Sequence, residues 1–213
     1  MHNIQNSILD QLMQSETKRF SELRPKRVDS NLFQYHLKAV IQDGLVEKVS
    51  SGYQLSAKGM YYADRYSALL KTERPQPKII TITIVRNSQG LVLLQQKLKQ
   101  PFIGTYHLPA GKIHEEEAII NAAQRELAEK TGLLLESFAF QTAVHVRIRS
   151  NKELVSEYYS YVLLVEHTSH IDGCVWYDPA LEEPAISLAP SVREVLEVGI
   201  SGDKSFHEIE VTI

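Results

Sequence analysis

The spacing of hydrophobic residues changes near residue 75 of this chain. Before that point, apolar residues recur every four positions, as in Ile4, Ile8 and Leu12, which is typical of a helix that buries one face. Beyond it, apolar residues gather in short runs such as Ile79–Val85 and Tyr161–Val165, which are typical of strands. The change predicts two domains, residues 1–74 and residues 75–213.

The first part of the chain is predicted to form helices and a β-hairpin. Asp29 or Ser30 can cap the start of a helix, and Gly44 can take the left-handed position that ends it. A turn at residues 50–52 separates two short strands. The first expected helix ends near Gln14, and the others span Arg19–Leu23, Asp29–Gly44 and Ala57–Leu70. The expected strands are Leu45–Val49 and Tyr53–Ser56.

Three helices followed by a β-hairpin form the layout of a winged helix-turn-helix. Asn31–Lys38 and Gly44–Lys48 resemble the recognition helix and wing entry of bacterial winged-helix regulators. The resemblance implies duplex DNA as a partner, contacted by the N-terminal half of the helix, which usually enters the major groove. The candidate DNA-binding residues are Ser30, Asn31, Gln34, Tyr35 and Lys38. A structural helix, or one that contacts protein, is the alternative.

The second part of the chain follows a polar segment, Lys71–Lys78, whose two prolines predict a linker. Its elements occur in a mixed order rather than as alternating strands and helices, which predicts an α+β fold. Trp176 and Tyr177 can stack on a nucleobase, but packing is the more common role of lone aromatics near a loop. The expected strands are Ile79–Val85, Leu91–Gln95, Phe138–Ile148, Leu154–Val165 and His207–Ile213, with helices over Glu117–Thr131 and Val192–Val198 and a loop or short strand over Gly104–Lys112.

One segment carries a set of residues at fixed spacing. After Gly111, Glu117 follows beyond five residues, and Arg125–Leu133 follows beyond seven more. The segment resembles the Nudix box, G-x5-E-x7-R-E-U-x-E-E-x-G-U, in which U is aliphatic. Every fixed position matches except the last glutamate of the Glu-Glu pair, which is Lys130. The resemblance implies a Nudix α/β/α sandwich, here preceded by the winged-helix domain.

The spacing gathers acidic groups on one side of a helix. Glu126, Glu129 and position 130 stand at i, i+3 and i+4, so they share one face. Carboxylates gathered in this way form a hard oxygen site that suits Mg²⁺. A metal-bound water can attack phosphorus while the metal neutralises charge on the diphosphate. Arg125 can reach Glu129 one turn further on, so we expect Arg125, Glu126 and Glu129 to carry the chemistry.

The Nudix resemblance also implies the ligands of the site. It implies Gly111, through its carbonyl, with Glu126 and Glu129 as ligands of Mg²⁺ or Mn²⁺. It further implies hydrolysis of a nucleoside diphosphate linked to another moiety. An additional acidic ligand often comes from a later strand or loop in this family, and the sequence leaves three candidates open: Glu157, Glu166 and Asp172.

Lys130 leaves two functions open. Its cation opposes Mg²⁺ binding by Coulomb repulsion, but it can also contact a phosphate directly, so we assign it to substrate binding. The first hypothesis is a Nudix pyrophosphohydrolase with a DNA-binding regulatory domain. The alternative is a transcription regulator whose degenerate Nudix domain senses a nucleotide sugar such as ADP-ribose.

Composition adds limits. The single cysteine, Cys174, excludes an internal disulfide and a cysteine-based zinc cluster. No apolar run approaches the roughly 18 residues of a membrane span, and the N-terminus lacks the pattern of a signal peptide, so we expect a cytoplasmic protein without a membrane partner. Residues 1–75 carry a net charge of +3 and residues 76–213 a net charge of −6, which suggests that the two parts have different functions. A homodimer is left open.

Overall fold

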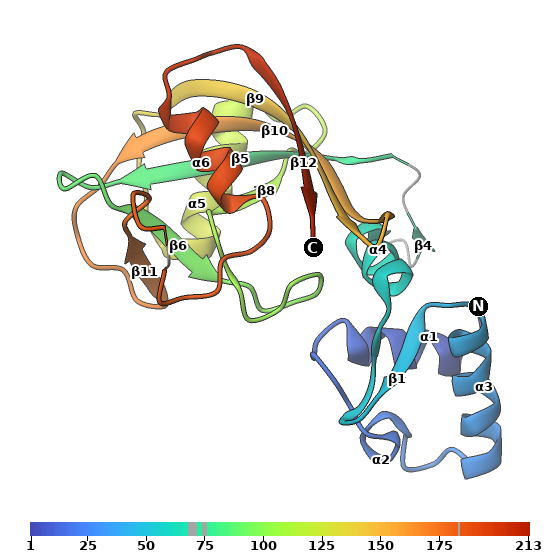
Figure 1. Ribbon diagram of the computed structural model, residues 1–213. Coiled ribbons are helices and arrows are strands. Elements are labelled where there is room, and N and C mark those ends of the chain that lie inside the picture. Colours follow the sequence, from blue (N-terminus) through green and yellow to red (C-terminus); the bar gives the residue numbers. More distant parts are fainter. Residues whose placement is uncertain (68–71, 74–75, 183) are drawn as a thin grey trace. The chain divides into compact units, whose positions relative to one another are not determined.

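The computed structural model describes residues 1–67, 72–73, 76–182 and 184–213. The chain forms two compact units (Figure 1). The first unit contains Met1–Pro75, Leu98–Ile103 and Arg149–Ser156, and the second contains Gln76–Lys97, Gly104–Ile148 and Glu157–Ile213. No helix in the described part of the chain is long and apolar enough to cross a membrane.

The first unit combines short helices with a hairpin. Its elements are α1 (Asn3–Leu12), α2 (Phe20–Leu23), α3 (Ser30–Gln42), β1 (Val46–Val49), β2 (Gly52–Leu55), α4 (Ala57–Arg65), β3 (Tyr66–Ser67) and β4 (Thr72–Glu73). In the hairpin, β1 and β2 are antiparallel and Val46 pairs with Leu55. The three helices and two strands predicted before residue 57 are confirmed, with bounds that differ by one to a few residues.

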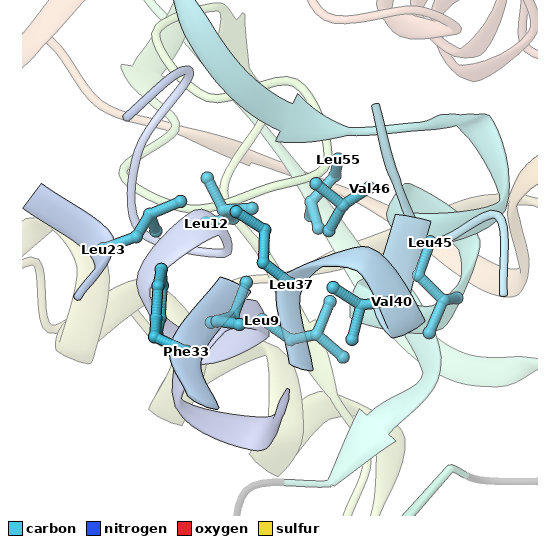
Figure 2. Packing of buried hydrophobic residues seen from close by; sticks show 10 residues of the cluster. Leu9, Leu12, Leu23, Phe33, Leu37, Val40, Leu45, Val46 and Leu55 are labelled. Atoms are coloured by element: carbon cyan, nitrogen blue, oxygen red, sulfur yellow. The ribbon is translucent and has the colours of Figure 1, made fainter. Parts of the chain in front are cut away.

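The core of the first unit comes from the apolar residues at helical spacing. Ile8 and Leu12 of α1 are fully buried in one cluster with Phe33 and Leu37 of α3. Residues of the hairpin, such as Val46, complete this cluster (Figure 2). Since one face of each helix is used for the core, the opposite face of α3 remains exposed.

The helix predicted over Ala57–Leu70 is wrong at its C-terminal end. Helix α4 ends at Arg65, and Tyr66 has the extended dihedral angles φ −64° and ψ 129°. Tyr66–Ser67 then pairs with Thr72–Glu73 of the predicted linker. A strand pair uses the backbone N–H and C=O groups that a further helical turn would need. The other residues of these two predictions, 68–71 and 74–75, lie outside the described residues.

The second unit contains a mixed sheet, which has eight strands among the described residues. The strands are in the order β11-β6-β5-β10-β9-β12, with β7 beside β6 and β8 beside β5. Strands β5 and β10 are parallel, whereas β5 is antiparallel to both β6 and β8. The elements are β5 (Lys78–Arg86), β6 (Val92–Gln96), β7 (Tyr106–His107), β8 (Ala110–Lys112), α5 (Ile119–Thr131), β9 (Ala139–Ser150), β10 (Glu153–Glu166), β11 (Cys174–Tyr177), α6 (Val192–Ile200) and β12 (Phe206–Thr212).

Helices α5 and α6 cover opposite faces of this sheet (Figure 1). Leu127 of α5 packs with Val85 of β5 and Leu93 of β6. Gly199 of α6 lies against Ile84, because a Cβ added to Gly199 would be 2.7 Å from the Ile84 Cδ1. Adjacent residues of a strand point to opposite faces, so Val85 faces α5 whereas Ile84 faces α6. The α+β class predicted for this part of the chain is confirmed.

Two details of the second unit differ from the predictions. Helix α5 begins at Ile119 rather than Glu117, because Glu116 has a left-handed φ of 61° and Ala118 is extended. Cys174–Tyr177 forms β11, antiparallel to β6, where no element was predicted. This strand has four residues and pairs with a segment far away in the sequence, so local spacing does not indicate it.

Candidate functional site

Helix α5 is anchored to the sheet by small and apolar residues. Ala122, Ala123 and Leu127 are buried, so the helix can pack closely on the strands behind it. The helix ends at Gly132, which has a left-handed φ of 75° and donates its N–H to the Ala128 carbonyl. The polar residues of the box are therefore held on a helix whose position and end are both determined.

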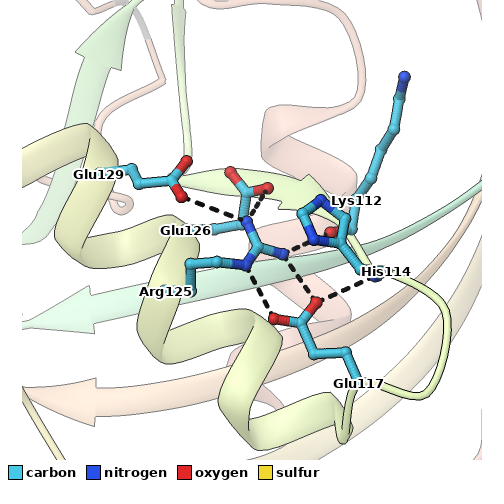
Figure 3. A network of polar contacts seen from close by, with 6 residues as sticks. All are labelled: Lys112, His114, Glu117, Arg125, Glu126 and Glu129. Atoms are coloured by element: carbon cyan, nitrogen blue, oxygen red, sulfur yellow. Dashed lines mark hydrogen bonds and ion pairs between the residues drawn. The ribbon is translucent and has the colours of Figure 1, made fainter.

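Arg125 is the centre of a polar network beside α5 (Figure 3). Its Nε and Nη2 donate to the two carboxylate oxygens of Glu117, each at 2.8 Å. Its Nη1 donates to Oε1 of Glu126 at 2.8 Å, and Nη2 also donates to the Lys112 carbonyl at 2.9 Å. The expected approach of Arg125 to Glu129 occurs as a longer ion pair of 3.6 Å. One guanidinium thus orients three carboxylates.

Glu117 is the main partner of Arg125. The hydrogen bonds from the Arg125 side chain, followed by the one from the His114 N–H, lower the pKa of Glu117 to about 2. The same hydrogen bond with Glu117 is the largest cause that raises the pKa of Arg125. Both groups are charged at neutral pH, and the bidentate pair ties the segment before α5 to the helix itself.

The carboxylate of Glu126 lies directly against the backbone of Gly111. A Cβ added to Gly111 would be 1.7 Å from Cδ of Glu126 and 1.9 and 2.2 Å from its two oxygens. The Glu126 side chain is only 11% exposed. Any side chain at position 111 would therefore displace this carboxylate, which explains physically why the position is a glycine.

The donors at this site fit a hard divalent cation that binds together with phosphate. Glu126 offers a carboxylate held by Arg125, and Glu129 offers one whose side chain is 58% exposed. The Gly111 carbonyl is the third donor that the sequence resemblance implies. Mg²⁺ commonly takes one or two carboxylates and completes its shell with waters and substrate phosphates. The described residues contain no group of three or more His, Cys, Asp or Glu that could hold a metal by itself.

Positive charge lies next to these carboxylates. Lys130 is exposed on α5, directly after Glu129. Desolvation of the imidazole, followed by the charges of Lys97 and Lys130, lowers the pKa of His107 to about 3. The His107 ring is therefore neutral at physiological pH, with its Nε2 at 3.4 Å from Nε2 of Gln95.

The candidates for an additional acidic ligand have other partners. Oε1 of Glu157 lies 3.0 Å from Nε2 of His145, and Oε1 of Glu166 lies 2.7 Å from Nη2 of Arg86. The third candidate, Asp172, is fully exposed and has an oxygen 3.3 Å from Nε2 of His170. Each of the three thus has a contact away from the Arg125 network.

Two residues of this site were not assigned a role from the sequence. Glu117 stands at a fixed position of the box, so a signal existed, but its bond to Arg125 spans eight residues across the start of α5. His107 carries no spacing signal. Its position depends on the pairing of β7 with β6, where Gln95 is opposite His107.

In the first unit, the predicted DNA-binding residues lie on the exposed face of helix α3, which is capped by Asp29. Asp29 caps α3 by accepting hydrogen bonds from the N–H groups of Asn31 and Leu32, at 2.8 and 3.1 Å. These hydrogen bonds are the main cause that lowers the pKa of Asp29. All five predicted contact residues are exposed: Ser30, Asn31, Gln34, Tyr35 and Lys38.

Comparison with known families gives one match that covers more than half of the chain. Residues 76–196 match the NUDIX domain family. This range contains the Arg125 network, helix α5 and the first five residues of helix α6, which runs from Val192 to Ile200.

Individual relatives match over shorter stretches. The 8-oxo-dGDP phosphatase NUDT18 of Mus musculus is 40% identical over 57 residues, which are 27% of this chain and 18% of that protein. The Homo sapiens protein of the same name is 37% identical over 57 residues, with the same two coverages. The aligned segment therefore spans less than a fifth of either relative.

Solved structures resemble part of this chain at low sequence identity. The NUDIX domain of Shewanella oneidensis NrtR, crystallised with ADP ribose, is 19% identical with a TM-score of 0.47, and covers 64% of this chain and 93% of that chain. A MutT NUDIX hydrolase from Burkholderia pseudomallei is 23% identical with a TM-score of 0.47, and covers 57% and 97%.

Proposed function

The chain belongs to the Nudix family, and from this premise we propose that it is a divalent-metal-dependent hydrolase that cleaves a nucleoside diphosphate linked to another moiety. The products are a nucleoside monophosphate and the phosphorylated moiety. The observation that carries the proposal is the Glu126 carboxylate, held between Arg125 and the Gly111 backbone, with the exposed Glu129 one turn away.

The residues of the chain divide the work. Glu126 and Glu129 hold the cation, and Arg125 keeps Glu126 oriented and charged. A bound Mg²⁺ supplies charge neutralisation on the diphosphate and a more acidic water. Lys130 contacts a phosphate of the substrate. Its positive charge there replaces part of the metal charge that a third carboxylate, at position 130, would have helped to bind.

The substrate is proposed to be a nucleoside-diphosphate compound. The names of the curated relatives contain 8-oxo-dGDP, so this nucleotide belongs in a substrate screen. ADP-ribose belongs there as well, because it represents the nucleotide sugars of the sensor hypothesis. Mg²⁺, Mn²⁺ and a chelator should be compared for each compound.

Glu129→Gln tests the proposed function. Replacing a ligand carboxylate by an amide should lower turnover about 100-fold or more, because a Lewis acid contributes several kcal/mol to phosphoryl chemistry. Since the Glu129 side chain is 58% exposed, the melting temperature should not change. The matched control is Glu136→Gln, which changes an exposed glutamate beyond the end of α5. Wild-type activity in Glu129→Gln would contradict the site.

A second function is favoured by the exposed face of α3. We propose that residues 1–74 form a winged-helix domain that binds duplex DNA through Ser30, Asn31, Gln34, Tyr35 and Lys38. The supporting observation is that all five are exposed, while Phe33 and Leu37 of the same helix are buried. Under the alternative, in which the chain is a sensor, Lys130 marks a Nudix domain that binds a nucleotide without efficient turnover.

A further inference from the structure

Thr81 of β5 has a buried hydroxyl group that the fold does not use. The residue is 1% exposed, and among the residues that the structure describes its Oγ1 has no hydrogen-bond partner. Burying a hydroxyl without a partner costs free energy, and a valine would fill nearly the same space without that cost. A threonine at this position therefore weakens the fold, and its presence needs an explanation other than stability.

The register of the sheet places Thr81 on the face covered by α5. Thr81 pairs with Gly111 across the antiparallel β5–β8 ladder, and paired residues point to the same face. The missing side chain of Gly111 would point at Glu126 of α5. Val85, four residues after Thr81 on the same strand, packs against Leu127 of α5. Both observations give the same orientation.

This orientation brings the hydroxyl close to the Glu126 carboxylate. Cβ atoms of directly paired residues are about 4.5–5.5 Å apart. The Glu126 carboxylate occupies the place where a Gly111 Cβ would be, since its atoms lie 1.7–2.2 Å from that point. The Thr81 hydroxyl is thus within reach of this carboxylate, by one hydrogen bond or through one water.

We propose that Thr81 is a positioning residue for Glu126. When Glu126 turns to bind a cation, the Thr81 hydroxyl donates to its carboxylate and fixes the orientation of the group from the sheet side. Arg125 already holds Oε1 of Glu126 at 2.8 Å, so the two donors together leave one direction for the cation. Glu126 is a metal ligand only under the proposed function, so the role of Thr81 rests on that function.

The test compares variants of the full chain by Mn²⁺ titration calorimetry and by thermal unfolding without metal. Thr81→Val should bind Mn²⁺ about tenfold more weakly, which is the usual effect of losing a group that orients a metal ligand. Its melting temperature without metal should equal or exceed that of the wild type, because the unpartnered hydroxyl is gone. Thr81→Ser keeps a hydroxyl and should restore most of the affinity.

Thr142→Val is the matched control. Thr142 is fully buried in the same unit, and its hydroxyl donates to the Ser205 carbonyl. Loss of this bond should lower the melting temperature and leave Mn²⁺ affinity unchanged. The control therefore shows the pattern expected for a hydroxyl with a structural role only.

The remaining outcomes separate the two proposals. If the wild type binds Mn²⁺ and Glu126→Gln does not, equal affinity of Thr81→Val and wild type would overturn the role of Thr81 alone. A lower melting temperature of Thr81→Val with unchanged affinity would assign the hydroxyl to the fold and overturn the role as well. A wild type without Mn²⁺ binding or hydrolysis would overturn the proposed function, and the role of Thr81 with it.

Discussion

Arg125 gives carboxylates of different exposure different tasks. Glu117, whose side chain is 16% exposed, accepts two hydrogen bonds from Arg125, which suits a structural anchor. Glu126 takes one bond, and Glu129 is 58% exposed at 3.6 Å. The contact with Arg125 weakens from Glu117 to Glu126 to Glu129, and Glu129, which is also the most exposed of the three, is the one that is freest to meet a cation.

The ion pair between Glu117 and Arg125 predicts a pH dependence of stability. The pKa of Glu117 is about 2 in the folded protein and ordinarily 4.5, so the charged form stabilises the fold above about pH 4.5. This contribution is lost as the pH falls towards 2. The melting temperature of the wild type should therefore exceed that of Glu117→Gln at neutral pH, and the difference should shrink towards zero near about pH 2. A difference that is independent of pH would contradict the pair.

Lys130 distinguishes the enzyme from the sensor. If Lys130 contacts a phosphate, Lys130→Glu replaces an attraction by a repulsion and should raise the KM about tenfold, or ~1.4 kcal/mol. Steady-state kinetics with Mg²⁺ check this, and Lys204→Glu, an equal change of charge on an exposed residue, should have no effect. A higher kcat in Lys130→Glu would instead favour the sensor, because a restored carboxylate would then improve a defective metal site.

At the scale of elements, helix α5 positions the site through its ends and its packed face. Its C-terminus depends on Gly132, whose φ of 75° is a conformation that other residues rarely adopt. A Cβ added to Gly132 would meet no atom within 4 Å among the described residues. The requirement for glycine at this helix end is thus a matter of backbone conformation and not of space.

Gly132→Ala should destabilise the second unit through this backbone strain. We expect a cost of about 1 kcal/mol, which lowers the melting temperature by roughly 2–4 °C for a domain of this size. Gly132→Asn should lose less, because asparagine tolerates the left-handed conformation better than alanine. Thermal unfolding of the three proteins gives the order. An alanine variant as stable as the wild type would show that the helix can end elsewhere.

For the whole molecule, charge and exposure differ between the two halves of the chain. The positive front part presents an exposed helix face, and the negative rear part contains the carboxylate network. The two proposed functions would give these two parts ligands of different chemistry, since phosphates of a duplex bind cationic surfaces and a metal with a diphosphate binds carboxylates.

Binding of the full chain to duplex DNA should weaken steeply with salt, because phosphate contacts release counterions. Selection from random duplexes identifies a sequence, and affinity is then measured over a range of salt concentrations. Lys38→Ala should reduce the slope of log affinity against log salt by about 1, whereas the control Lys204→Ala should not. Selection without enrichment, together with no salt-dependent binding at low ionic strength, would favour a protein partner for α3.

The sequence alone determined the elements and residues that depend on near neighbours. The helices before residue 57, the hairpin and the end of α5 at Gly132 follow from spacing and caps within a few positions. The face shared by Glu126 and Glu129 follows from the helical repeat. The Nudix box was also found from the sequence alone, because a motif at fixed spacing is a local property. The match of residues 76–196 to the NUDIX domain family supports it.

Only the tertiary structure decided the contacts that depend on register between distant segments. Three such contacts come from segments that are far apart in the sequence. They are the pairing of Thr81 with Gly111, the position of the Glu126 carboxylate against Gly111, and the pairing of His107 with Gln95 of β6. Strand β11 exists because β6 offers it an edge. A slip of one residue in any of these pairings would turn every side chain to the other face, and local spacing carries no information about that choice.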